Sequence, residues 1–464
     1  MRRIRDQKSG EVSHMEQNTL AVANRATYRE LGLATVAAMS LLPFGGLAAQ
    51  ESALSGTLSL GITSSQEPQM RQVVAAYEQL HPNVSVQLNI LSGGSNELRR
   101  GLITRQMAQR MPDIVSTYDR FPRQFAEAGL TADMTQYLTR GGPISQDNFA
   151  EFFVGQYIVD GGEHSGEIHG LPVGADVVVL YYNKSDFDEA GLDYPDDTWT
   201  WDDVVEAARE LTVTENGQTT RYGFGTRYHW HATYVPAIAA FGGQFLGDDG
   251  LVQLDTEAAV KAFRLYLDHV QEGIFATPAA IASIGDEASA FGNNLYSMLA
   301  GVRAHVPRIR AAMAEGMDFD VALPPINPET GDRASGMGSV GIALTPVGIE
   351  NSEISYDFLD FFYNEEGGMG VLASTYAVTP PVDTLFDSPI WRDLPAPPGN
   401  NDVFVQAMDT GVPNPSGIPA DSQGVIDTAI RNMVDQVLIA GMSVEEALIQ
   451  AQETINAEII RSRN

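Results

Sequence analysis

Residues 57–90 read TLSLGITSSQEPQMRQVVAAYEQLHPNVSVQLNI, and this stretch decides the fold. The apolar run at 57–62 predicts a strand, and the apolar residues of 67–80 recur on one face of a predicted helix. The sequence His-Pro-Asn at 81–83 ends that helix, and a second predicted strand follows at 84–90. The stretch is therefore a strand–helix–strand unit.

The same alternation continues with a predicted helix at 97–110 and a predicted strand at 113–115. Because a helix joins each strand to the next, all three strands should be parallel. Further apolar runs at 176–182 and 340–344 predict buried strands. This pattern predicts an α/β fold.

Capping residues mark three later helices. Thr200 and Asp203 have capping-box spacing, and Thr256 precedes a helix that Gly273 ends. Ser443 marks the start of a final helix in the same way.

Composition limits the class of protein. The chain has 464 residues, 44% hydrophobic and 19% charged, which is typical of two or three globular domains and excludes wholesale disorder or a polytopic membrane protein. Sixty acidic residues against 28 basic ones give a net charge of −32, which repels nucleic acid and favours a monomer. Both a saline habitat and a GC-rich genome would explain the scarcity of lysine.

The N-terminal region has the pattern of an export signal. Residues 31–49 carry no charge, follow Arg25 and Arg29, and end with the small residues Ala48 and Ala49. We expect residues 1–49 to be a cleaved signal peptide, with an uncleaved anchor and a later start codon as alternatives. The chain has no cysteine, so it has neither disulfides nor a lipoprotein anchor. An exported, unanchored protein is retained only inside an outer membrane, which predicts the periplasm of a Gram-negative cell.

Glycine and histidine motifs do not indicate an enzyme or a metal site. GMGSVG at 336–341 is followed by an apolar strand rather than a helix, so it favours a tight backbone crossing or a ligand-facing loop over dinucleotide binding. His229 and His231 would share one face of a strand, and His164 lies five residues before His169. Without cysteine or a carboxylate at a recognised ligand spacing, we expect no metal and no cofactor.

Two polar and aromatic clusters suggest a ligand site. Tyr118, Asp119 and Arg120 follow a predicted parallel strand, and ligands of open α/β sheets bind at this end of the strands. Trp230 and His231 belong to a second cluster. Aromatic rings stack on sugars while charged side chains satisfy the hydroxyls, so these clusters are typical of a carbohydrate site. The alternative is that they are ordinary core residues and a surface ion pair.

Seven segments in order resemble the family 1 extracellular solute-binding proteins of ABC importers, of the maltose-binding and multiple-sugar-binding type. The segments are PDIVSTYDRFPRQFAEAGL (112–130), IHGLPVGADVVVLYYNKSDFDEAGL (168–192), TWTWDDVVEAARELT (198–212), AFGGQF (240–245), LYSMLAG (295–301), SVGIAL (339–344) and SVEEALIQAQETI (443–455).

The resemblance implies a type II periplasmic binding protein with two lobes, each a mostly parallel sheet flanked by helices, joined by crossing strands. It places residues 50–174 and 342–388 in the first lobe and residues 175–341 and 389–464 in the second. It also implies that the protein captures a mono- or oligosaccharide by hinge closure and delivers it to the transmembrane subunits of an ABC permease, without catalysis. A secreted glycan-processing enzyme, or a binding protein for an amino acid, opine or polyamine, is the alternative.

The resemblance also implies which residues contact the ligand. Where the family often has an aromatic residue after Gly301, this chain has Val302 and Arg303, which disfavours long α-glucans and suggests a smaller or acidic sugar contacted by Arg303. The predicted ligand-binding residues are Ser64, Ser65, Tyr118, Asp119, Arg120, Asp176, Trp230, His231, Arg303 and Ser339.

Overall fold

The computed structural model describes residues 54–91, 95–415 and 418–463, which belong to one compact unit within residues 52–464. The predicted signal peptide at 1–49 lies outside the described residues. Among the described residues, no helix has the length and apolar character that crossing a membrane requires.

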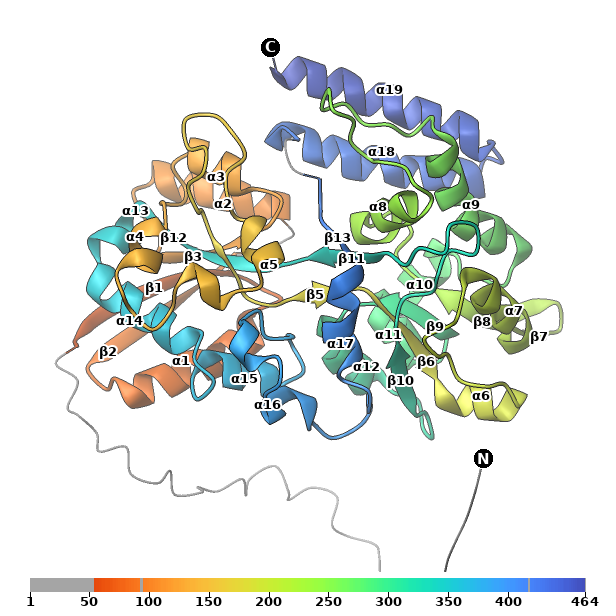
Figure 1. Cartoon of the computed structure of the whole chain (residues 1–464), viewed down its shortest axis with the longest axis horizontal. Coiled ribbons are helices and arrows are strands. Elements are labelled where there is room, and N and C mark those ends of the chain that lie inside the picture. Colours follow the sequence, from red (N-terminus) through yellow and green to blue (C-terminus); the bar gives the residue numbers. More distant parts are fainter. Residues whose placement is uncertain (1–53, 92–94, 416–417, 464) are drawn as a thin grey trace, which may run out of the picture. The chain divides into compact units, whose positions relative to one another are not determined.

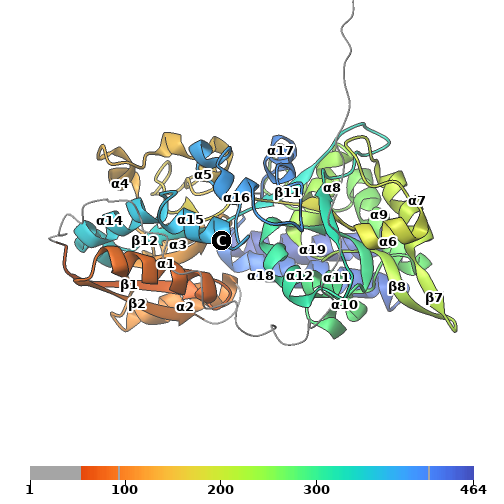
Figure 2. The ribbon, with the colours of Figure 1, turned by 90° about the horizontal axis from the view of Figure 1, so that it is seen from below.

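The first sheet begins with the predicted strand–helix repeat. It contains β1 (Gly56–Thr63), α1 (Glu67–Leu80), β2 (Val84–Leu91), α2 (Ser95–Met107) and β3 (Ile114–Tyr118). The strand β1 pairs in parallel with both β2 and β3, which confirms the parallel arrangement expected from the helical crossovers. Figure 2 shows β1 and β2 side by side.

Two further strands complete this sheet in the order β2-β1-β3-β12-β4, and of these only β12 runs opposite to the rest. The strand β12 (Val340–Leu344) coincides with the predicted run and pairs with β3 and with β4 (Leu171–Pro172). Its register places Val340 opposite Tyr118, so the next residues beyond this pair, Ser339 and Asp119, are neighbours.

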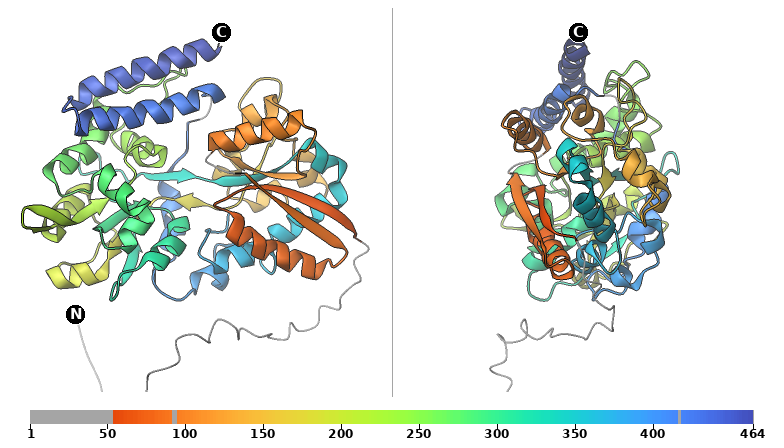
Figure 3. Two further views of the ribbon diagram at one scale, coloured as in Figure 1. Left: turned by 180° about the vertical axis from the view of Figure 1, so that it is seen from behind. Right: turned by 90° about the vertical axis from the view of Figure 1, so that its left-hand side faces the viewer.

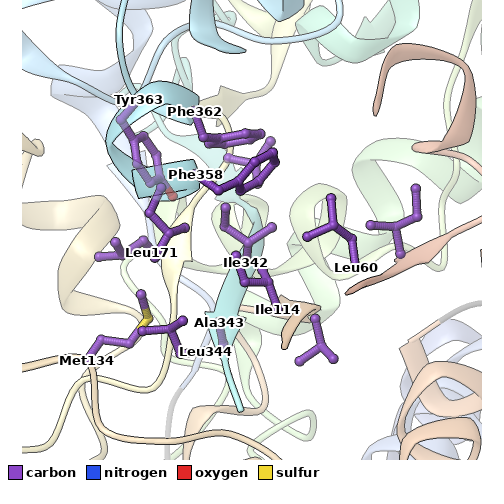
Figure 4. Close-up of a cluster of buried hydrophobic side chains, with 14 of the residues drawn as sticks. Leu60, Ile114, Met134, Leu171, Ile342, Ala343, Leu344, Phe358, Phe362 and Tyr363 are labelled. Carbon is purple, nitrogen blue, oxygen red and sulfur yellow. The ribbon is translucent and has the colours of Figure 1, made fainter. Parts of the chain in front are cut away.

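Apolar side chains from this sheet and from α14 (Ser352–Phe362) form one core. In Figure 4, Leu60, Ile114 and Ile342 on the strands lie near Phe358 and Phe362 on the helix. Elsewhere along this part of the chain are α3 (Pro122–Glu127), α4 (Thr135–Thr139), α5 (Glu151–Gly155), α13 (Pro346–Glu350), α15 (Gly368–Ser374) and α16 (Pro389–Arg392).

The second sheet has the order β10-β6-β9-β8-β7. Its strands are β10 (Phe319–Ala322), β6 (Val179–Asn183), β9 (Tyr296–Gly301), β8 (Gln218–Gly225) and β7 (Val213–Glu215). Only β8 and β9, which helices connect, are parallel among its described pairs, whereas we expected mostly parallel sheets. The antiparallel β7–β8 pair is a hairpin closed by Asn216-Gly217, which both have positive φ, as this tight turn requires.

Helices cover this sheet, and their caps follow the sequence. The capping box of Thr200 and Asp203 begins α7 (Trp201–Leu211). Thr256 caps α9 (Glu257–Glu272), and Gly273 ends it with a left-handed backbone. The remaining helices of this part are α6 (Lys184–Ala190), α8 (His231–Ala240), α10 (Pro278–Ile284), α11 (Glu287–Gly292), α12 (Val306–Ala312), α17 (Val403–Gln406), α18 (Ala420–Leu438) and α19 (Val444–Arg463). Figures 1 and 3 show α18 and α19 lying side by side.

Short strands connect the two groups of elements. The strand β11 (Ser335–Gly338) pairs with β5 (Asp176–Val177) and with β13 (Gly411–Val412), and Figure 1 shows β5 and β11 between the larger sheets. The run expected as one strand at 176–182 is therefore two strands, because Val178 turns its N–H to the carbonyl of Gly336 and the chain then enters the second sheet.

The glycines of GMGSVG allow close backbone packing at this connection. A Cβ atom on Gly336 would lie 1.9 Å from the carbonyl oxygen of Ala232, and one on Gly341 would lie 2.5 Å from the ring of Tyr157. The motif spans the end of β11 and the start of β12, with Ser339 between the two strands. The prediction of a tight backbone crossing is confirmed.

Candidate ligand-binding site

A pocket of about 440 Å³ lies where β3, β5, β11, α8 and α18 meet. It brings together most of the predicted ligand-binding residues: Tyr118, Asp119, Arg120, Asp176, Trp230, His231 and Ser339. Asp119 and Arg120 also line a larger hollow of about 990 Å³ that extends along α3 and is lined as well by residues 413–415 and 418–419. The two cavities therefore share a wall at the end of β3.

Backbone pairing holds the Asp119 carboxylate in place. Its Oδ2 atom accepts hydrogen bonds from the Ser339 N–H (3.0 Å) and from Nδ2 of Asn414 (2.8 Å). Burial raises the pKa of this carboxyl, while the Arg120 charge and these hydrogen bonds act in the opposite direction. Ser339 follows β11 and Asn414 follows β13. The two hydrogen bonds of Asp119 therefore link the end of β3 in the first sheet to the ends of these connecting strands.

The Asp176 carboxyl is partly enclosed and incompletely satisfied. Its Oδ1 atom is inaccessible to solvent and has no hydrogen-bond partner among the described residues. Burial raises its pKa from 3.8 to about 7, and the negative charge of Asp119 contributes to the increase. An enclosed acceptor without a partner is costly, and this cost falls on a residue that lines the pocket.

Ser339 faces the pocket beside a buried tyrosine. Its hydroxyl is 2.7 Å from the hydroxyl of Tyr157, which also donates to the Ser339 carbonyl at 3.0 Å. Tyr157 is fully buried and thus fixes the position of Ser339 from behind.

An aromatic and histidine cluster forms the other wall. Trp230 is the N-cap residue of α8, and the guanidinium of Arg227 lies 5.7 Å from the center of its ring. Burial lowers the pKa of His229 to about 4 and that of His231 well below its usual value, with the charge of Arg227 acting in the same direction on both. Both rings are therefore neutral hydrogen-bonding groups at physiological pH.

His229 and His231 do not share a strand face as the sequence interpretation assumed. His229 lies in a turn before the helix, and His231 is the first residue of α8. This geometry removes the basis for pairing them as metal ligands.

Sequence reasoning missed the contribution of α18. Asp427 and Arg431 line the pocket one helical turn apart, and Nη1 of Arg120 lies 3.8 Å from Oδ1 of Asp427. Arg227 and His229 complete the polar lining. Only His229 had a local signal, in the sequence His-Trp-His, because α18 reaches the pocket through packing of segments far apart in the chain.

The structure does not bring Ser64, Ser65 or Arg303 to this pocket. Ser64 and Ser65 are exposed in the turn after β1, and the Ser65 hydroxyl lies 3.0 Å from that of Thr63.

Arg303 is fully buried instead of lining the ligand site. Its guanidinium donates to the Val378 carbonyl (3.0 Å), to Oδ1 of Asn401 (2.8 Å) and to the Trp391 carbonyl (3.3 Å). It also lies 5.3 Å from the center of the Phe404 ring. Burial lowers its pKa to about 10. These contacts give Arg303 a structural role, and the expected contact with an acidic sugar has no geometric support.

Comparisons with known proteins agree with this fold. The family model for bacterial extracellular solute-binding proteins matches residues 63–369. The arabinooligosaccharide-binding protein of Halalkalibacterium halodurans is 26% identical over 370 residues, covering 77% of this chain and 79% of that protein. A putative binding protein of Brucella abortus is 24% identical over 305 residues, covering 64% of this chain and 69% of that protein.

Solved structures show the same two-lobed fold. An ABC substrate-binding protein from Listeria monocytogenes, solved with cycloalternan, has a TM-score of 0.75 at 20% identity, covering 88% of this chain and 99% of that one. A Mycobacterium tuberculosis protein solved with glycerophosphocholine has a TM-score of 0.73 at 17% identity, covering 89% of this chain and 100% of that one. At these identities the likeness establishes the fold alone, and the second protein shows that the fold also accommodates a non-sugar ligand.

Proposed function

The chain belongs to the bacterial extracellular solute-binding proteins, and from this premise we propose that it captures a mono- or oligosaccharide for an ABC importer. Relatives named for arabinooligosaccharides, lactose and maltotriose support a carbohydrate over other solutes. The transmembrane subunits of the permease are the proposed partners, and the binding protein acts as a periplasmic monomer. Residues 1–49 are the proposed cleaved signal peptide.

The observation that carries the proposal is the chemistry of the 440 Å³ pocket. Asp119, Asp176 and Arg120 offer acceptors and donors for hydroxyl groups, and Trp230 offers a ring for the C–H face of a sugar. The Asp176 carboxyl lines the pocket and supplies an acceptor for a sugar hydroxyl.

We propose that the ligand closes two lobes around itself. The first lobe comprises residues 50–174 and 342–388, and the second comprises residues 175–341 and 389–464. One hydrophobic core draws its residues from 58–173 and 342–385, and a second core draws its residues from 180–322 and 426–459, which supports this division. A third core combines Phe153 and Tyr376 of the first set with residues of the second. A sugar that contacts Asp119 on one side and Trp230 on the other binds the closed form more tightly, so it shifts the population toward closure.

The proposed ligand leaves the site chemically unchanged. Asp119 and Asp176 are assigned to hydrogen bonding, because the family binds solutes rather than transforming them. The permease then receives the sugar from the closed protein.

The proposal is tested by titration calorimetry with arabino-oligosaccharides, malto-oligosaccharides, lactose and cycloalternan, with glycerophosphocholine and amino acids as non-sugar ligands. We expect saturable binding of one sugar per chain and recovery of that sugar unaltered by chromatography. Asp176→Ala and Trp230→Ala should each weaken binding, whereas Asp435→Asn on the exposed surface of α18 should not. Binding of a non-sugar alone would contradict the substrate class, and a cleaved sugar would contradict the assignment to transport.

A further inference from the structure

We propose that His164, Glu167 and His169 form a binding site for one Zn²⁺ ion, separate from the sugar pocket. This group is the only set of three histidine, aspartate or glutamate residues with converging ligand atoms found within the described part of the chain. None of the three lines the sugar pocket.

The three side chains converge through a single carboxylate oxygen. Oε2 of Glu167 lies 2.8 Å from Nδ1 of His164 and 2.9 Å from Nε2 of His169. One ligand atom from each residue lies within 4.8 Å of the other two. Tetrahedral Zn²⁺ with bonds of about 2.0–2.1 Å separates its ligand atoms by roughly 3.4 Å, so only small side-chain movements are needed for binding.

Backbone hydrogen bonds already hold the segment in this shape. The Val159 N–H donates to the Glu167 carbonyl at 2.9 Å, and the Glu167 N–H donates to the His164 carbonyl at 3.0 Å. A bridge between Ile158 and Ile168 closes the base of the turn. The sequence predicted no metal site because no carboxylate has a recognised ligand spacing, and Glu167 lies between the two histidines in the arrangement His-x-x-Glu-x-His.

A buried hydroxyl orients the innermost ligand. Oγ1 of Thr131 lies 2.9 Å from Nδ1 of His169, and both side chains are buried. When the Nδ1–H donates to Thr131, the lone pair of Nε2 points toward Glu167, which is the tautomer a metal ion requires. Partners that orient a ligating histidine in this way are a recurrent feature of zinc sites.

Exposure also fits a metal ion. The side chain of His169 is 2% exposed, while those of His164 and Glu167 are 30% and 37% exposed, so the site has a buried inner side and an open outer side. The open side leaves room for a water molecule as the fourth ligand.

A bound ion would brace the wall behind the sugar pocket. The His169 N–H donates to the Tyr157 carbonyl at 2.9 Å, and the Tyr157 hydroxyl contacts Ser339 in that pocket. We therefore expect Zn²⁺ to raise the thermal unfolding temperature of the protein.

The test is titration calorimetry of metal-free, full-length protein with ZnCl₂, together with visible absorption after addition of CoCl₂. We expect one ion per chain and the absorption bands of four-coordinate Co²⁺. His164→Gln and Glu167→Gln should each lower the affinity by at least about tenfold, and Thr131→Val, which removes only the orienting hydroxyl, by roughly 10- to 100-fold.

A matched control exists on α9. Nδ1 of His269 lies 3.0 Å from Oε2 of Glu272 at the same spacing as His164 and Glu167, but no second histidine of the described chain joins them. His269→Gln should leave the Zn²⁺ affinity unchanged. Three results would each overturn the proposal: no saturable Zn²⁺ binding, full Zn²⁺ affinity in folded His164→Gln, or loss of Zn²⁺ binding in His269→Gln. His164 is partly exposed in a turn, so this variant should keep its fold, which circular dichroism checks.

Discussion

Replacing Asp176 by asparagine should stabilise the ligand-free protein and weaken sugar binding at the same time. In the folded protein, burial and the nearby Asp119 charge raise the pKa of Asp176 from 3.8 to about 7. When folding raises the pKa of a carboxyl, the protonated carboxyl stabilises the folded state at pH values below the unfolded pKa. This contribution to the free energy of unfolding is lost as the pH rises through the pKa of the folded protein. Asparagine keeps the shape of the side chain without the charge.

The size of the stability change follows from the pKa. A rise from 3.8 to about 7 corresponds to an upper limit of about 4 kcal/mol at 1.36 kcal/mol per pH unit. The side chain is partly exposed, and solvent screening reduces this to about 2 kcal/mol. Asp176→Asn should therefore have a free energy of unfolding about 2 kcal/mol higher than the parent above pH 7, with a difference near zero below pH 4.

Urea denaturation between pH 4 and pH 8, paired with sugar titration at each pH, measures both effects. Loss of a hydrogen bond to a charged acceptor costs about 1.5–3 kcal/mol, so the sugar affinity of the variant should fall by roughly 10- to 100-fold at neutral pH. Asp435→Asn serves as the control for removing one surface charge. A stability difference that does not change with pH would refute the reasoning about burial, and an unchanged affinity would remove Asp176 from the site.

Four further substitutions separate binding from stability. Trp230→Ala should weaken sugar binding about tenfold or more in calorimetry with little change in unfolding free energy, and equal affinity would argue against ring stacking. Arg303→Met should lower the free energy of unfolding by about 3 kcal/mol in urea denaturation, because buried oxygens lose their donors, and unchanged stability would contradict its structural role. Gly336→Ala should cost at least about 2 kcal/mol in the same assay through its clash with Ala232, and a neutral effect would mean that the crossing is not tightly packed. Tyr157→Phe should cost about 1 kcal/mol, and a stabilising effect would contradict the contact with Ser339.

Local signals in the sequence predicted most of the first sheet. The helix expected at 67–80 matches α1 at both ends. Pro68 favours a helix start at this position and His81-Pro82 ends the helix, and both effects depend only on neighbouring residues. The Thr200 cap was predicted for the same reason. The directions of strands in the second sheet could not be predicted this way, because they depend on which distant strands become neighbours.

The candidate site was predictable where it follows strand ends. Asp119 directly follows β3 and Asp176 begins β5, and the apolar patterns of both runs were visible in the sequence. Arg303 follows a strand in the same way, yet contacts with segments 376–404 bury it, and no local pattern indicates that burial. Asp427 and Arg431 reach the pocket because α18 packs across it, which only the tertiary structure shows.

The most direct test of the account is a crystal structure of the protein with the sugar that calorimetry identifies. We predict an intact sugar in the 440 Å³ pocket, hydrogen-bonded to Asp119 and Asp176 and stacked on Trp230. A sugar bound outside this pocket, or a cleaved product within it, would contradict the account.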